Sequence, residues 1–490
     1  MRKSGILMHI SSLPGPYGIG SMGKCAYDFV DFLAEAGQTY WQILPLCPTG
    51  YGNSPYQSFS SFAGNHYLID LDKLIEEGLL EREEVARVEW SREETRVDFG
   101  LLYDHRVATL RKAFARFTPD KDFEEYVKDN ADWLEDYALF MALKEKFHDS
   151  DWQSWTLILM VRLPEVLDAY RQELDEGIRF QYFLQYQFRR QWQALRRYAN
   201  GKGIKIIGDV PIYVPLDSAD VWANPFIFQL DPSRRPKRVA GCPPDSFIAD
   251  GQLWGNPLYD WEAMKNSGYS WWIRRLKAAS HMYDVIRLDH FRGFEGYWSI
   301  PAGDKTAGSG QWVKGPGTDF IDAIQEALPN LEFIAEDLGY VDGPVRELQE
   351  YSGYPGMKVM EYAFDSRAKY SYMPHLHPVN SVAYVGTHDN TPMRQWFADA
   401  DPADVARAKA YLGLNDEEGY VWGVIRGCMN STSKLCIIQM QDYLGLGGEA
   451  RMNVPGTLSE NNWTWRASPG FTTPQLAEKI RTMTERYGRS

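Results

Sequence analysis

Strand-like apolar runs that end in an acidic residue recur along this chain, and they constrain its fold more than any other feature. The acids are Asp289 after the run 285–288, Glu336 after 333–335 and Asp389 after 382–387. An ionised group at the end of a buried strand is costly unless it is paired. A structural ion pair would account for one such run. Repetition of the pattern instead indicates that several strands deliver carboxylates to one shared edge.

The order of strand, long loop, helix and strand is typical of a parallel α/β architecture. A helix is expected over 26–36, ending at Gly37. The expected strands are 6–10, 40–46, 205–214, 285–288, 333–336, 357–362, 382–387 and 435–440. Eight strands with interleaved helices predict a (β/α)8 TIM barrel with inserted, largely helical and loop subdomains. Because such barrels carry chemistry at the carboxyl ends of their strands, Asp209, Asp289, Glu336 and Asp389 are expected on one face.

Three stretches interrupt this order, and each is expected to be an insertion into a single catalytic barrel domain that spans 1–490. Residues 66–195 are rich in Glu, Arg, Lys and Leu at helical spacing, which predicts a mostly helical insertion after the second strand. Residues 213–280 are rich in Pro, Asp, Trp and Gly and predict a loop-rich insertion after the third. A small Gly-rich insertion over 300–318 is expected after the fourth.

Composition excludes several classes of protein. The formal net charge of −14 argues against a nucleic-acid partner. Five cysteines without a close pair indicate neither a disulfide framework nor a zinc site. No signal-peptide segment and no apolar run long enough to span a bilayer is present, so we expect a cytoplasmic protein with no membrane partner. The oligomeric state is left open. The 17 Trp and 29 Tyr suit a cleft that stacks on flat, hydroxyl-rich ligands.

Two kinds of chemistry fit converging carboxylates in an aromatic cleft. In glycosyl transfer, one carboxylate attacks the anomeric carbon and a protonated one donates to the leaving oxygen. In a metal-dependent hydrolase, the ligands would be Asp209, Asp289, Asp389 and His388. Arg287 lies two residues before Asp289, on the same side of the strand, and supplies a cation where a metal would otherwise do so. Glycosyl transfer without a metal or cofactor is therefore favoured over the metal alternative.

The acid-bearing segments resemble the conserved regions of the α-amylase superfamily, and the chain as a whole resembles the amylomaltase or disproportionating-enzyme family, the 4-α-glucanotransferases. The supporting segments are 10–14, 52–56, 208–212, 251–255, 287–290, 335–339, 354–358, 387–390 and 453–457. They follow the family's order over nearly the whole chain. The resemblance implies a single barrel with inserted subdomains and no separate C-terminal sandwich.

By this resemblance Asp289 is the nucleophile, Glu336 the general acid/base and Asp389 the transition-state stabiliser. Arg287 is expected to keep Asp289 ionised, and neighbouring carboxylates are expected to raise the pKa of Glu336. His388 is expected to donate a hydrogen bond beside Asp389. For a retaining mechanism the nucleophile and the acid should lie ~5 to 5.5 Å apart.

Further residues are expected to bind substrate or support the site. Tyr56 and Trp254 are expected to stack on glucose rings, with loop core as the alternative. Asp209 and Arg287 are expected to support the acids, although Asp209 could merely cap its strand. Candidates for lining the donor side are Ser54, Asn453, Pro455 and Gly456.

The expected reaction is transfer of α-1,4-glucan segments from a donor to the 4-hydroxyl of an acceptor glucan or glucose, by retaining double displacement through a covalent glycosyl-aspartate. The expected substrates are maltooligosaccharides, amylose, glycogen or starch. Preference for transfer over hydrolysis rests on the resemblance, so an α-glucan hydrolase of the same barrel clan remains the alternative. A non-catalytic glucan-binding barrel would not need Arg287 together with three acids.

Overall fold

The fold is a closed barrel of parallel strands. The computed structural model describes residues 2–50, 52–244, 250–367 and 372–490. The barrel strands are β1 (Lys3–Leu7), β2 (Tyr40–Gln42), β3 (Lys205–Val210), β6 (Val285–Leu288), β9 (Glu332–Ala335), β10 (Gly356–Val359), β11 (Ser381–Tyr384) and β12 (Leu435–Gln439). They pair in chain order, and β1 pairs with β12 to close the ring. The predicted (β/α)8 barrel is confirmed.

Strand boundaries differ from the prediction where local signals mislead. β1 begins at Lys3 and includes Gly5, a residue that weakens isolated strands. Here glycine is required, because a Cβ on Gly5 would lie 2.4 Å from the main-chain oxygen of Tyr40. The sixth barrel strand, β10, was predicted to extend to residue 362. That end is wrong, because β10 ends at Val359 and α15 (Met360–Phe364) begins immediately after it. A continuous apolar run does not distinguish a buried strand from a buried helix.

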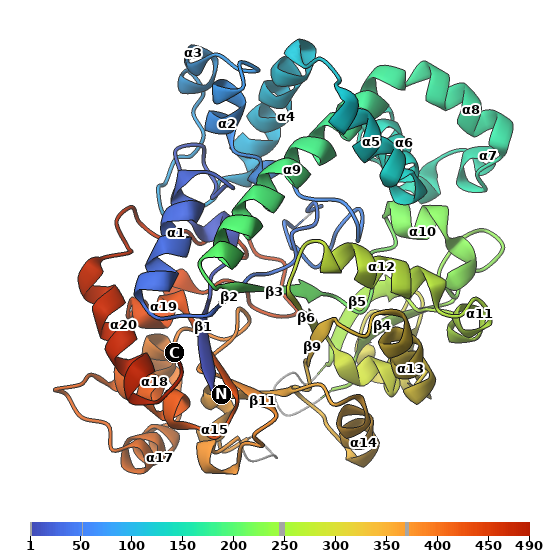
Figure 1. Cartoon of the computed structure of the whole chain (residues 1–490). Helices are drawn as coiled ribbons and strands as arrows, with labels where there is room; N and C mark the ends of the chain where they lie inside the picture. Colours follow the sequence, from blue (N-terminus) through green and yellow to red (C-terminus); the bar gives the residue numbers. More distant parts are fainter. Residues whose placement is uncertain (1, 51, 245–249, 368–371) are drawn as a thin grey trace.

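Helices on the outside of the barrel follow most strands. They are α1 (Lys24–Glu35), α13 (Thr318–Ala327), α14 (Gly343–Ser352), α16 (Met393–Asp399), α17 (Pro402–Leu412), α18 (Tyr420–Asn430), α19 (Met440–Tyr443) and α20 (Pro474–Arg486). Figure 1 shows α1 and α20 side by side on one flank, with the two termini close together below them. The barrel seam therefore joins the first and last elements of the chain.

The stretch between β2 and β3 is helical. Its helices are α2 (Leu71–Glu76), α3 (Arg82–Ala86), α4 (Phe99–Arg116), α5 (Lys121–Asp129), α6 (Ala131–Lys146), α7 (Leu157–Met160), α8 (Pro164–Glu173) and α9 (Asp175–Gly201). The long helix α9 packs on α6 and returns the chain to β3 (Figure 1). Tyr137 and Phe140 of α6 are buried, so these aromatic side chains belong to the core.

A second, antiparallel sheet lies beside the barrel, and sequence analysis did not foresee it. Its strands, in spatial order, are β5 (Gln252–Pro257), β4 (Arg238–Cys242), β7 (Gly296–Pro301) and β8 (Gln311–Lys314). β4 belongs to the segment that follows β3, and β7 belongs to the segment that follows β6. The pairing of β4 with β7 therefore connects these two segments. The first of these segments also contains the helices α10 (Ala219–Ala223), α11 (Trp261–Asn266) and α12 (Ser270–Ser280).

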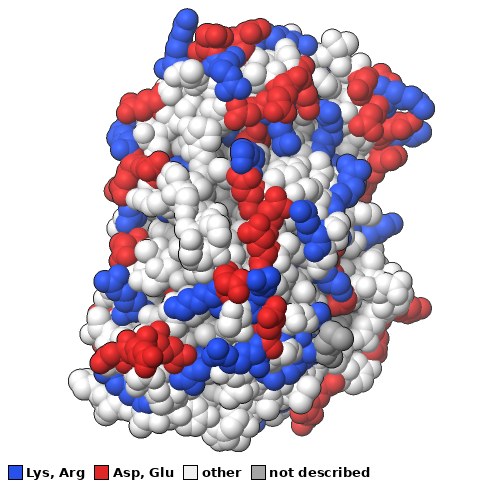
Figure 2. Space-filling view, turned by 60° about the vertical axis from the view of Figure 1, so that its left-hand side comes forward, with Lys and Arg blue, Asp and Glu red and all other residues white. Residues whose placement is uncertain are grey.

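The surface carries charges of both signs. On the face drawn in Figure 2, Lys and Arg side chains lie among Asp and Glu side chains. Within the described part of the chain, no helix has the length and apolar character needed to cross a membrane.

Candidate active site

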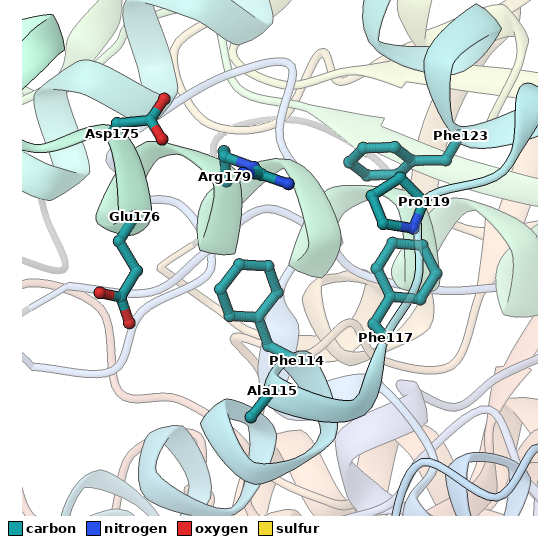
Figure 3. A pocket seen from close by; sticks show the side chains of 8 residues that line it. All are labelled: Phe114, Ala115, Phe117, Pro119, Phe123, Asp175, Glu176 and Arg179. Atoms are coloured by element: carbon teal, nitrogen blue, oxygen red, sulfur yellow. The ribbon is translucent and has the colours of Figure 1, made fainter.

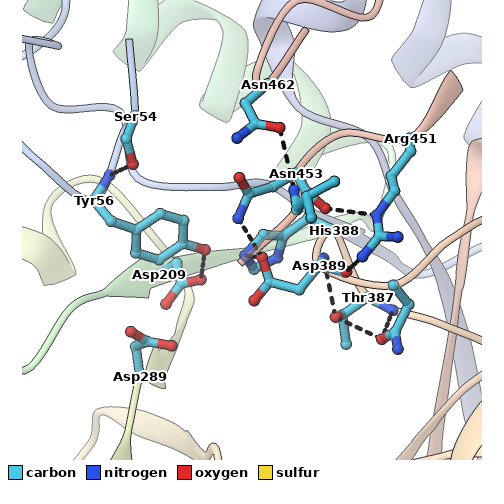
Figure 4. A network of polar contacts seen from close by, with 12 residues as sticks. Ser54, Tyr56, Asp209, Asp289, Thr387, His388, Asp389, Arg451, Asn453 and Asn462 are labelled. Atoms are coloured by element: carbon cyan, nitrogen blue, oxygen red, sulfur yellow. Dashed lines mark hydrogen bonds and ion pairs between the residues drawn. The ribbon is translucent and has the colours of Figure 1, made fainter. Parts of the chain in front are cut away.

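The barrel topology brings the acidic residues together at the carboxyl ends of neighbouring strands. Asp289 follows β6 directly, and its N–H donates to the main-chain oxygen of Val210 at 3.0 Å. Glu336 follows β9, and its N–H donates to the oxygen of Leu288 at 3.0 Å. Figure 4 shows the side chains of Asp289 and Asp389 directed toward the same space. The sequence prediction that these strand ends meet at one edge agrees with this arrangement.

Arg287 links two of the carboxylates. Its Nη1 donates to both oxygens of Asp209, at 2.7 and 2.8 Å, and to Oδ1 of Asp289 at 2.8 Å. The side chains of Arg287 and Asp209 are only 5% and 1% exposed, against 27% for Asp289. The pair therefore lies beneath Asp289, whose side chain is the most exposed of the three. The guanidinium also occupies the space between the two carboxylates that a shared metal ion would need.

Glu336 combines a half-buried side chain with fixed hydrogen bonds. Its Oε2 accepts from the N–H of His290 at 2.8 Å, and its Oε1 from the N–H of Leu338 at 2.7 Å. Burial raises the pKa of Glu336 to about 7, with Asp289 acting in the same direction and Arg287 opposing it. The expected contribution of a neighbouring carboxylate is present, because Asp289 raises this pKa, and burial is the larger cause.

Asp389 is held from the C-terminal part of the chain. Its Oδ1 accepts from Nδ2 of Asn453 at 2.7 Å, and its main-chain oxygen accepts from Nη2 of Arg451 at 2.7 Å. Nε2 of His388 lies 3.4 Å from the same Oδ1. The Asp389 side chain is 40% exposed, so it is fixed on one side and open on the other (Figure 4). Sequence analysis named Asn453 and His388 but missed Arg451.

Tyr56 lies inside this cluster. Its hydroxyl donates to Oδ2 of Asp209 at 2.7 Å, and its ring stacks on His388 with centroids 5.2 Å apart. Trp463, which sequence analysis missed, packs against both rings at 5.7 and 6.0 Å. Ser54 does not point to a separate partner, since its hydroxyl accepts from the N–H of Tyr56 at 3.2 Å. Ser54 therefore helps to fix the backbone that carries Tyr56.

Trp254 and the loop 453–457 meet at the edge of the site. The Trp254 ring is half-buried and packs edge-on against His290, with centroids 4.8 Å apart. Its Nε1 donates to Gln252, and a Cβ on Gly456 would lie 4.0 Å from that same side chain. Pro455 is half-buried and Gly456 is exposed. The loop from the C-terminal part thus adjoins the strand that carries Trp254.

Two hollows lie away from the acids. One, of about 280 Å³, is formed by α4, α5 and the start of α9; Figure 3 shows Phe114, Phe117 and Phe123 on one side and Asp175, Glu176 and Arg179 on the other. The other, of about 250 Å³, includes Phe62, Trp133 and Arg274. Neither is lined by any of the three acids, so the cluster at the strand ends is the stronger candidate site.

Comparison with known proteins agrees with this geometry. The family described as 4-alpha-glucanotransferase matches residues 8–472. The 4-alpha-glucanotransferase of Clostridium butyricum is 48% identical over 98% of this chain and 100% of its own. That of Thermus thermophilus is 46% identical over 99% of this chain and 98% of its own. A solved structure of amylomaltase from Streptococcus agalactiae in complex with acarbose superposes with a TM-score of 0.97, at 41% identity and full coverage of both chains.

Proposed function

The chain belongs to the 4-alpha-glucanotransferase family, and from that premise we propose how its three acids carry out the transfer. Its activity is that of a 4-alpha-glucanotransferase, and its substrates are glucans. The transferred group is a segment of α-1,4-glucan, which passes to the 4-hydroxyl of an acceptor glucan or of glucose. The segments 66–195, 213–280 and 300–318 belong in this proposal to one catalytic domain and surround its cleft.

In the first half of the reaction, a carboxylate oxygen of Asp289 attacks the anomeric carbon of the donor. The bond from that carbon to the glycosidic oxygen breaks, and protonated Glu336 gives its proton to the departing oxygen. The leaving glucan carries that proton away as a free 4-hydroxyl. A covalent glycosyl-aspartate and an ionised Glu336 remain.

In the second half, ionised Glu336 removes the proton from the 4-hydroxyl of the acceptor. The acceptor oxygen attacks the anomeric carbon, and the bond to Asp289 breaks. Glu336 is protonated again and Asp289 is again a carboxylate, so the enzyme returns to its starting state. Two displacements at one carbon retain the α configuration.

The observation that carries this proposal is the unequal environment of Asp289 and Glu336. Asp289 is ion-paired with Arg287 at 2.8 Å. The half-buried Glu336, with a pKa of about 7, exchanges a proton near neutral pH. Two carboxyls in such different surroundings suit the separate roles of a nucleophile and an acid/base.

The remaining residues support the sugar that is transferred. Asp389, oriented by Asn453, is proposed to accept hydrogen bonds from ring hydroxyls and to strengthen them as the ring flattens toward the oxocarbenium ion. His388 is proposed to donate beside it. Trp254 and the loop 453–457 are proposed to limit water access to the covalent intermediate, which favours transfer over hydrolysis.

Incubation with pure maltotriose tests the proposal. Transfer lengthens the oligosaccharide ladder and releases glucose while the number of reducing ends stays constant. A steady rise in reducing ends would instead identify hydrolysis by the same acids. Absence of any change would contradict a catalytic role for the cluster.

A further inference from the structure

Two exposed aromatic rings lie next to the loop that carries Glu336. Trp312 of β8 is 39% exposed and Tyr340, four residues after Glu336, is 51% exposed. Their ring centroids lie 6.2 Å apart with an interplanar angle of 23°. Large apolar side chains that gather at a surface beside an active site are typical of binding surfaces. The reaction as described above uses neither ring.

Buried groups hold this pair in place. The guanidinium carbon of Arg292 lies 3.7 Å from the Trp312 ring centroid and 5.2 Å from that of Tyr340. The Arg292 side chain is 7% exposed, and its Nη1 donates to the main-chain oxygen of Tyr340 at 2.7 Å. Trp298 packs edge-on against Trp312 at 5.1 Å. The Trp312 ring thus rests on fixed neighbours while part of it stays open to water.

The residues that hold the two rings are connected to the catalytic residues through the backbone. Arg292 belongs to the short 3-10 helix Phe291–Phe294, which begins two residues after Asp289. The end of this helix also holds the segment after β8, because the N–H of Gly317 donates to the oxygen of Phe294 at 2.8 Å. The ring pair therefore has a fixed relation to both Asp289 and Glu336.

The chemistry of Glu336 indicates which part of the substrate these rings face. In the proposed mechanism Glu336 protonates the oxygen that departs with the leaving glucan, and later activates the acceptor hydroxyl at the same place. The loop that continues from Glu336 accordingly borders the leaving and acceptor chains rather than the transferred segment. Four residues of extended chain span at most ~14 Å, so Tyr340 lies within the reach of an oligosaccharide bound at Glu336.

We propose that Trp312 and Tyr340 form an aromatic platform that binds a glucose unit of the acceptor glucan beyond the unit that reacts. Sugar rings present C–H groups on their faces, and flat aromatic side chains with a polar tip suit them by stacking and hydrogen bonding. The proposal rests on the assignment of Glu336 as acid/base. It predicts that this platform distinguishes long acceptors, which reach it, from glucose, which does not.

The kinetic test compares two acceptors with one activated donor, α-maltosyl fluoride. Losing one stacking contact of this kind should raise the KM for maltotetraose as acceptor by about three- to tenfold in Trp312→Ala and in Tyr340→Ala. The KM for glucose should stay within about twofold of the parent value, a change that corresponds to only ~0.4 kcal/mol. Tyr351→Ala is the matched control, because Tyr351 is an equally exposed tyrosine on α14 whose hydroxyl bonds Asp322. Equal increases for both acceptors, or none for maltotetraose, would overturn the platform.

A binding measurement separates this proposal from the assignment of Glu336. Calorimetric titration of maltoheptaose into Glu336→Gln and into the same variant carrying Trp312→Ala needs no turnover. The second variant should bind about three- to tenfold more weakly, and Trp312→Phe should restore most of the affinity. Unchanged affinity would refute the platform. If Glu336→Gln alone keeps full activity, the acid/base assignment fails, and the titration still decides whether the rings bind glucan.

Discussion

Replacing Glu336 by glutamine is the sharpest test of the proposed chemistry. Glutamine keeps the shape of the side chain and can still accept from the N–H of His290 or Leu338, but it cannot deliver a proton to a departing oxygen. General acid–base catalysis contributes about 10²- to 10⁴-fold to such reactions. The kcat of Glu336→Gln on maltotriose should therefore fall by that factor, which corresponds to about 3 to 5.5 kcal/mol.

A comparison of two donors shows whether the group removed by Glu336→Gln is the general acid. Fluoride leaves without protonation, so α-maltosyl fluoride should glycosylate Asp289 in the variant at close to the parent rate. Without a base the second half is slow, and the maltosyl enzyme should accumulate. Mass spectrometry of the intact protein measures it, with Asp289→Asn as the control that forms no adduct. Equal impairment with both donors, or unimpaired turnover of maltotriose, would refute the assignment.

The role of Glu336 also predicts how the activity and the stability of the parent enzyme depend on pH. Activity in the first half needs protonated Glu336, so kcat/KM of the parent enzyme should fall about tenfold per pH unit above its pKa of about 7. Because burial raises this pKa from its ordinary value of 4.5, the folded state binds the proton more tightly than the unfolded state. This difference in proton affinity contributes about 3 kcal/mol to the free energy of unfolding below pH 4.5. The contribution declines as the pH rises and is lost above pH 7. Urea unfolding should record that decline in the parent protein and a smaller one in Glu336→Gln.

Further substitutions test the groups around the acids. Arg287→Met leaves Asp209 buried without its partner and should destabilise the protein by about 3 to 5 kcal/mol, measured by urea unfolding; a loss below 1 kcal/mol would contradict its bridging role. Asn453→Ala removes a hydrogen bond to a charged carboxylate, worth about 1.5 to 3 kcal/mol, so kcat/KM should drop at least tenfold while the unfolding midpoint changes little. Dialysis against EDTA should leave the activity on maltotriose unchanged, whereas activity that is lost and then restored by a divalent cation would favour the metal alternative.

The barrel could be predicted from the sequence because its signal is local and repeated. Most barrel strands contain a short buried apolar run, and several of these runs are followed by a charged residue that marks the carboxyl end. Where that signal is weak, prediction is wrong or incomplete. The four-stranded sheet was missed because its strands are short, rich in Gly, Pro and Trp, and pair across distant segments, as β4 does with β7. Long-range pairing of this kind leaves no periodic trace in the sequence.

The residues of the site likewise divide into those that could be predicted from the sequence and those that could not. Asp209, Asp289 and Glu336 could be named because they stand at strand ends, where the barrel fixes their direction. Arg451 could not, since its contact with Asp389 spans 62 residues and its own segment has no distinctive pattern. Trp463 was missed for a related reason: its contacts with Tyr56 and His388 depend on how the last loop folds back over the barrel.

A single stretch, 285–294, determines how the nucleophile and the acid are related in space. Arg287 aligns Asp289, while the N–H of His290 holds the carboxyl of Glu336 and the N–H of Phe291 donates to its main-chain oxygen at 3.0 Å. His290 has a φ of 52°, a left-handed conformation that is strained for a residue with a side chain. That turn directs two successive N–H groups from the strand bearing the nucleophile toward the acid on the next strand. Backbone N–H groups that hold Glu336 and the Arg287 side chain that holds Asp289 therefore fix the two carboxyls relative to one another. Arg292 extends this connection to the aromatic rings beyond them.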